Sequence, residues 1–78
     1  MVRILYFSLL REKIGITEEE LEFEGRVGEL RRLLIEKYPQ ASTIIESVKF
    51  AVNEEYVDDD FIISEGDRIA LIPPVSGG

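Results

Sequence analysis

The stretch VRILYFSL, residues 2–9, is almost continuously apolar. A run of this length without regular polar alternation is typical of a central β-strand covered on both faces. In such a strand one face carries Val2, Ile4 and Tyr6, and the other carries Arg3, Leu5 and Phe7. Because the second face includes an arginine, we expect that this face is not wholly part of the core.

A second apolar stretch, Arg68–Ile72, lies near the other end of the chain. It follows a predicted tight turn at Glu65–Asp67, which contains Gly66. These two stretches are the most apolar in the sequence. We therefore expect them to lie side by side and parallel at the centre of one sheet.

The segments between these two stretches have different periodicities. Glu20–Glu24 alternates strictly between acidic and apolar residues, which predicts a half-buried strand in a hairpin with the first, after a turn at 12–17. From Val27 the apolar spacing becomes helical, and Pro39 ends the predicted helix. Arg26 stands at the helix N-cap, where Ser or Thr is preferred, so we expect a cost of about 1 kcal/mol.

The remaining part of the chain adds short elements. We expect a helical turn at Ser42–Ser47, a third strand at Val48–Val52, a turn at Asn53–Glu55 and a short strand at Tyr56–Val57. Together the elements predict an α+β, β-grasp domain over residues 1–72, with a mixed sheet of about five strands packed on one main helix. Residues 73–78 form an extended tail.

Composition excludes several classes of function. The chain has 78 residues, enough for one domain, and contains neither Cys nor His. Thiolate nucleophiles, disulfides and imidazole bases are therefore absent. The aspartates at 58–60 form a solvated loop without the spacing of a calcium loop, so we expect no bound metal. We also expect no bound cofactor.

Charge and hydropathy bear on partners and location. The chain has nine basic and sixteen acidic residues, which give a formal net charge of −7. Such a surface repels nucleic acid and anionic lipid, so neither is an expected partner. The acidity suits a partner with a basic docking face, although it also serves solubility alone. No signal peptide or apolar run of about 20 residues is present, which predicts a cytoplasmic protein.

The C-terminal segment PPVSGG, residues 73–78, is the most informative motif. Its two prolines cannot donate to a sheet ladder, so they end the last strand and keep the chain extended. Gly77 and Gly78 lack side chains and can enter a narrow channel, leaving the Gly78 carboxylate unhindered. We expect this carboxylate to be the reactive group, activated as an adenylate and converted to a thiocarboxylate. A tail that ends in glycine by chance is the alternative.

The whole chain resembles the small subunits of molybdopterin synthase, the MoaD-type sulfur carriers of the ubiquitin-like MoaD/ThiS family. The resemblance is carried by residues 2–7, Arg11-Glu12 and Gly15, Val27–Leu30, Ala51–Asn53, and 65–70 running into Pro73–Gly78. The terminal Pro-Pro-x-x-Gly-Gly is its most specific part. Ser76 falls at a position that varies in the family.

The resemblance implies a mechanism and two protein partners. An E1-like enzyme uses ATP to adenylate Gly78, and sulfur then replaces one carboxylate oxygen. The tail enters the large subunit of molybdopterin synthase, in an expected heterotetramer, and gives its sulfur to cyclic pyranopterin monophosphate in molybdenum cofactor biosynthesis. The chain alone would not be an enzyme, since the catalytic side chains belong to the large subunit.

The resemblance also implies a docking surface. Phe7, Tyr56 and Ile72 match an apolar patch that contacts the large subunit, continued by the tail residues Pro73, Pro74, Val75 and Ser76. The alternative for the first three is ordinary core or scattered surface.

Other uses of the same tail remain open at this point. The carrier chemistry could serve tRNA thiolation, thiamin or a tungsten cofactor. An activated Gly78 could also be joined to lysines, as in a protein modifier, or the domain could be an interaction module with an inert tail.

Overall fold

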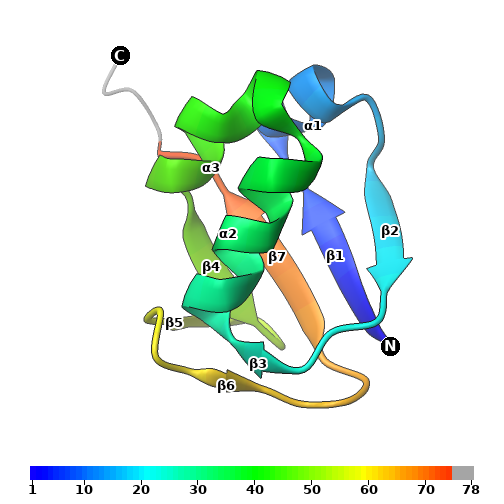
Figure 1. Ribbon diagram of the computed structural model, residues 1–78, viewed down its shortest axis with the longest axis vertical. Coiled ribbons are helices and arrows are strands. Elements are labelled where there is room, and N and C mark those ends of the chain that lie inside the picture. The colour runs from blue at the N-terminus through cyan, green and yellow to red at the C-terminus, as the bar shows by residue number, and fades with distance from the viewer. Residues whose placement is uncertain (75–78) are drawn as a thin grey trace.

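The computed structural model describes residues 1–74. Its main sheet has five strands in the order β2-β1-β7-β4-β5 (Figure 1). β1 (Val2–Tyr6) and β7 (Arg68–Ile72) are parallel neighbours, and β2 (Glu18–Leu21), β4 (Lys49–Val52) and β5 (Glu55–Val57) complete the sheet with antiparallel pairings. The predicted β-grasp architecture, with the first and last strands together near the centre, is confirmed.

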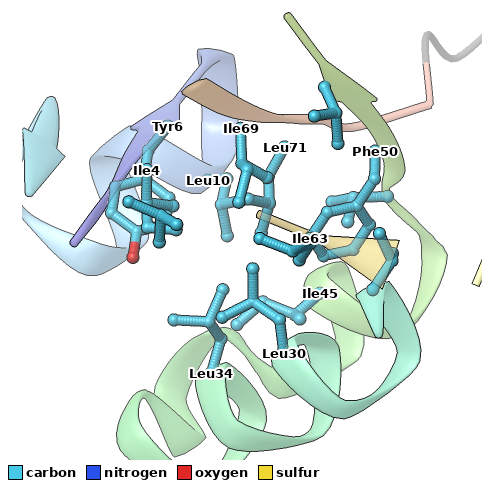
Figure 2. Close-up of a cluster of buried hydrophobic side chains, with 14 of the residues drawn as sticks. Ile4, Tyr6, Leu10, Leu30, Leu34, Ile45, Phe50, Ile63, Ile69 and Leu71 are labelled. Atoms are coloured by element: carbon cyan, nitrogen blue, oxygen red, sulfur yellow. The ribbon is translucent and has the colours of Figure 1, made fainter. Parts of the chain in front are cut away.

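One face of this sheet is covered by helices (Figure 1). The main helix, α2 (Val27–Lys37), crosses it, and the 3-10 helix η1 (Pro39–Ala41) and α3 (Ser42–Ser47) follow. Val27, Leu30 and Leu34 of α2 are fully buried, as the helical spacing predicts. They meet Ile4, Tyr6, Ile69 and Leu71 from the two central strands (Figure 2).

The first predicted strand is too long, because the chain turns after Tyr6 into an additional helix, α1 (Ser8–Ile14). Ser8 has φ 53°, in the left-handed region, which ends the extended conformation. The helix then buries Leu10 completely and packs Ile14, one turn later, against the core. The expectation of a turn at 12–17 is therefore wrong for residues 12–14, which belong to α1, whereas the chain does turn at 15–17.

The second strand is also shifted relative to its prediction. β2 ends at Leu21, and the apolar residue of the following stretch, Phe23, lies half-buried outside the sheet. A second, two-stranded sheet was not predicted: β3 (Gly25–Arg26) pairs with β6 (Ile62–Ile63). It joins the start of α2 to the long connection between β5 and β7.

This connection accepts hydrogen bonds from the first N–H groups of α2, which an N-cap side chain would otherwise accept. The N–H groups of Val27 and Gly28 donate to the carbonyls of Phe61 and Asp59, each at 2.9 Å. The Glu29 carboxylate accepts from the N–H of Arg26 at 2.8 Å. The expected penalty for Arg26 is thus reduced, because other groups pair with the N–H groups that an N-cap would serve.

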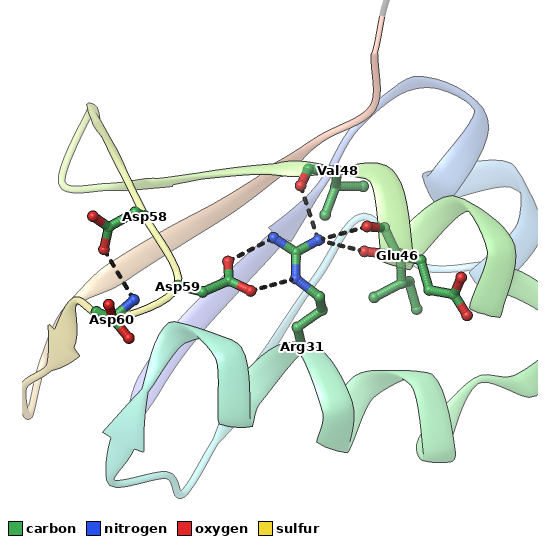
Figure 3. A network of polar contacts seen from close by, with 7 residues as sticks. Arg31, Glu46, Val48, Asp58, Asp59 and Asp60 are labelled. Carbon is green, nitrogen blue, oxygen red and sulfur yellow. Dashed lines mark hydrogen bonds and ion pairs between the residues drawn. The ribbon is translucent and has the colours of Figure 1, made fainter.

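Arg31 fixes the same connection from the helical side (Figure 3). Its guanidinium binds both carboxylate oxygens of Asp59, at 2.8 and 3.2 Å. It also donates to the carbonyls of Ile45, Glu46 and Val48 at the end of α3, and lies over the Phe50 ring. One side chain therefore ties α2, α3 and the loop at 58–60 together.

Candidate functional site

The tail begins at the end of a central strand. β7 is hydrogen-bonded to β1 on one side and to β4 on the other, and it ends at Ile72. Pro73 is half-buried and Pro74 is exposed. Val75, Ser76, Gly77 and Gly78 lie outside the described residues, so their predicted roles stay predictions. β7 is paired along both edges as far as Leu71, and its last residue, Ile72, pairs with Lys49 of β4.

No element of residues 1–74 covers the sheet face opposite the helices (Figure 1). Strand registers place a row of apolar side chains across it, from Leu5 through Ala70 and Ala51 to Tyr56. Tyr56 is 68% exposed. The prediction that β1 is covered on both faces is therefore wrong. The expectation that the face carrying Arg3, Leu5 and Phe7 lies partly outside the core is confirmed.

Phe7 and Ile72 extend this row toward the tail. Phe7, just beyond β1, is 43% exposed, and it lines the same hollow as Leu5 and Ala70. Ile72 is half-buried and lies next to Lys49 in the β4–β7 register. We call this set the open-face patch: Leu5, Phe7, Ala51, Tyr56, Ala70 and Ile72. The three residues expected at a docking surface thus share one face, with Ile72 leading directly into the tail.

Sequence reasoning missed the middle of this patch. Ala51 and Ala70 join the two ends of the row, and both line a hollow of about 610 Å³ on this face. Small side chains between larger ones leave a shallow depression, which an apolar side chain of a partner can fill. Only the strand register reveals it, because the two alanines are far apart in the sequence.

Charged side chains border the patch. Arg3 donates to Glu18 at 2.6 Å and lies 3.6 Å from Glu20. The hydrogen bond to Glu18, followed by the charges of Glu18 and Glu20, raises the pKa of Arg3. Arg68 is adjacent to Arg3 in the parallel register and also lines the hollow. The rim is therefore charged and the centre apolar, the usual anatomy of a protein interface.

The most perturbed acid–base groups lie on the covered side of the sheet. The Glu19 carboxylate accepts from Tyr6 at 2.6 Å, from Tyr38 at 2.5 Å and from Lys37 at 2.7 Å. Burial alone would raise the pKa of Glu19, but these hydrogen bonds and the charge of Lys37 outweigh it and lower the pKa. Burial and the Glu19 carboxylate raise the pKa of Tyr6. This cluster joins the edge strand β2 to the end of α2, and we assign it a structural role.

The described residues contain no cluster that we assign to catalysis or to metal binding. In residues 1–74 no group of three acidic, Cys or His side chains converges as a metal site. In the aspartate loop, Asp59 is bound by Arg31 while Asp58 accepts from the N–H of Asp60. Within the same range, no helix is long and apolar enough to cross a membrane.

Comparisons with known proteins found a matching family model and similar sequences. A family model described as "ThiS family" matches residues 4–78. A Caenorhabditis briggsae protein named "Molybdopterin synthase sulfur carrier subunit" is 40% identical over 81 residues, which cover 99% of this chain and 96% of that protein.

Solved structures share the fold. The small archaeal modifier protein 1 of Methanosarcina acetivorans has a TM-score of 0.84 at 26% identity, covering 99% of this chain and 95% of that one. A Helicobacter pylori complex of subunits 1 and 2 of molybdopterin-converting factor contains a similar chain, with a TM-score of 0.72, 23% identity and coverage of 99% and 97%. The match of the family model over nearly the full length shows that this chain belongs to the ThiS family.

Proposed function

We propose that this chain is the sulfur carrier, and small subunit, of a molybdopterin synthase. The observation that carries the proposal is the end of β7 at Ile72, in a central strand whose open face is apolar and not covered by another element of residues 1–74. The similarity to curated sulfur carrier subunits, which runs through almost the whole chain, supports the same function.

The proposed chemistry takes place at the Gly78 carboxylate. A carboxylate is a poor electrophile, so an E1-like enzyme first joins it to AMP, using ATP and releasing pyrophosphate. Sulfur at the oxidation level of sulfide then takes the place of AMP, which leaves with one of the carboxylate oxygens, and the product is a thiocarboxylate. Its sulfur forms a bond to a carbon atom of cyclic pyranopterin monophosphate. Water then cleaves the bond between this sulfur and the Gly78 carbonyl carbon, which leaves the sulfur on the acceptor and returns Gly78 to the carboxylate.

The partners must supply all acid–base groups for these steps. The chain has no His and no Cys, and its perturbed carboxylate, Glu19, is already bound by three donors on the covered side. The chain contributes the substrate end and a surface that positions it. We therefore assign docking of the large subunit to Phe7, Tyr56 and Ile72, with Pro73, Pro74, Val75 and Ser76 entering its active site in a heterotetramer.

Intact mass spectrometry tests the carrier chemistry. The protein is incubated with its activating enzyme, ATP and a sulfur donor, and we expect a mass gain equal to the replacement of oxygen by sulfur. A variant lacking Gly78 should show none. An unchanged wild-type mass, with an activating enzyme shown to be active on another carrier, would refute the proposal.

Affinity for the large subunit tests the docking surface. Phe7→Ala removes an exposed ring, so the fold should persist while the dissociation constant rises by about tenfold or more. Arg32→Ala, on the exposed side of α2, is the control and should bind like the wild type. Equal affinities for both variants would exclude Phe7 from the interface.

A protein modifier is the second candidate, favoured by the similarity to small archaeal modifier protein 1. In that case an amine of a target lysine, rather than sulfur, would displace AMP and form an isopeptide bond. Antibody detection of higher-mass conjugates that disappear on deletion of Gly78 would support it. A thiocarboxylate formed without such conjugates would favour the carrier.

A further inference from the structure

A second hollow lies beside the root of the tail, on the helical side. It has a volume of about 460 Å³ and is lined by apolar and hydroxyl side chains: Ser8, Leu9, Thr43, Ile44, Ser47, Pro73 and Pro74. No charged side chain of the described residues lines it. The tail root is therefore flanked by two apolar surfaces, the open-face patch and this hollow, and Ile72–Pro74 connects them.

Leu9 is the most exposed large apolar residue of the hollow. The left-handed backbone of Ser8 starts α1 so that Leu10 points into the core, and Leu9 is left 51% exposed. Ile44 is half-buried on the next wall, α3. Figure 1 shows the end of β7 running past α3 toward the tail. An isolated exposed leucine is ordinary, but one that joins an apolar hollow at this position requires an explanation.

The length of the tail limits how far a partner can stay from this hollow. Four residues, 75–78, follow Pro74, and four extended residues span at most about 13 Å. Any enzyme that acts on Gly78 must therefore bring its active-site entrance within this distance of Pro74. The side chains around Pro74 then face that enzyme. Among them, the side chains that line the hollow are uncharged.

The opposite end of the molecule provides the contrast. The hollow there is lined by Met1, Glu22, Phe23, Glu24 and Glu65, and so carries three carboxylates. An acidic wall is costly to cover unless the partner supplies matching cations, whereas an apolar wall gains from being covered. The uncharged hollow is the one that lies next to the reacting end.

We propose that Leu9 and Ile44, together with Pro73 and Pro74, form a second docking site for the large synthase subunit, which inserts an apolar side chain into it. This inference rests on the proposed function. The hollow and the open-face patch lie on either side of Ile72–Pro74, so a single partner can cover both surfaces.

The test measures the dissociation constant of the complex between the full chain and its purified large subunit. We expect Leu9→Ala and the polar, similarly sized Leu9→Gln each to raise it by about tenfold. Ile62→Ala is the matched control, because Ile62 is 60% exposed but lies on β6, away from the tail. The control should bind like the wild type, and thermal unfolding should confirm that all three variants are folded.

Two further readouts separate this inference from the proposed function. In the Leu9 variants the affinity for the large subunit should fall by a larger factor than the rate of thiocarboxylate formation by the activating enzyme. If Phe7→Ala loses affinity but the Leu9 variants do not, the proposed function stands and the second docking site is wrong. If the Leu9 variants instead slow only thiocarboxylate formation, the hollow belongs to the activating enzyme and the inference also fails. A wild-type chain that does not bind the large subunit would overturn both.

Discussion

The two faces of the main sheet come from the same strands but differ in what their side chains contact. On the covered face Ile4, Ile69 and Leu71 are fully buried under α2. On the open face the corresponding positions hold Leu5, Ala70 and Ile72, none of which is fully buried. The apolar residues of the covered face stabilise the fold, and we assign those of the open face to partner binding.

Neighbouring residues of β7 give the largest expected contrast between the two faces. Leu71→Ala should lower the free energy of unfolding by about 3.5 kcal/mol, because it leaves a cavity beneath α2. Ile72→Ala, on the other face of the same strand, should cost about 1 kcal/mol. Urea denaturation measures both values. Equal losses would show that the open face contributes to the core as much as the covered face does.

Arg31 tests whether the covered side also depends on polar contacts. Arg31→Met keeps much of the aliphatic stem but leaves Asp59 and three carbonyl groups without their donor. We expect a loss of about 2.5 kcal/mol in the free energy of unfolding. Arg32→Met, one residue along and exposed, should change it by less than about 0.5 kcal/mol. Similar values for the two variants would mean that the Arg31 network adds little.

Glu19, on the covered side of the sheet, makes part of the free energy of unfolding depend on pH. Its pKa is lowered in the folded state, so its contribution is fully present above the usual value of 4.5 and is lost as the pH falls through the lower, folded-state pKa. At pH 7 Glu19→Gln should cost about 1.5 kcal/mol, because its donors lose a charged acceptor. The difference from the wild type should shrink below pH 4.5. A difference that stays constant in acid would show that Glu19 is not stabilised as a carboxylate.

Tyr56 should show the smallest effect on stability. It is the most exposed of the large apolar residues on the open face, so Tyr56→Ala should change the free energy of unfolding by only about 0.5 kcal/mol. The affinity of the Tyr56→Ala variant for the large subunit should nevertheless fall. Calorimetry of the free chain and titration with the large subunit measure the two quantities. A large loss of stability with unchanged affinity would reverse the assignment of the two faces.

Much of this fold could be predicted because the long elements have clear periodicity. The helical spacing after Val27 and the apolar content of the first and last strands identified α2, β1 and β7. The beginning of α1 could not be found, since Ser8 and Leu9 continue an apolar run and only their backbone changes direction. The two-residue strands β3 and β6 are too short to show a period.

The site was predicted less completely, for a different reason. Phe7, Tyr56 and Ile72 came from the family resemblance, and the structure places them on one face. Ala51 and Ala70 became visible only through strand register, and Leu9 and Ile44 meet only after α1 and α3 have packed. Surfaces formed by distant segments leave no local pattern in the sequence.

The position of β7 has a consequence for how the protein is made. This strand lies between β1 and β4 but is the last of the five strands of this sheet to be synthesised. While it is inside the ribosome, the β1–β2 and β4–β5 hairpins have no strand to join them, and isolated hairpins are marginally stable. The domain can therefore complete its sheet only after Ile72 has emerged, so a partly synthesised chain cannot present a finished docking face to either partner.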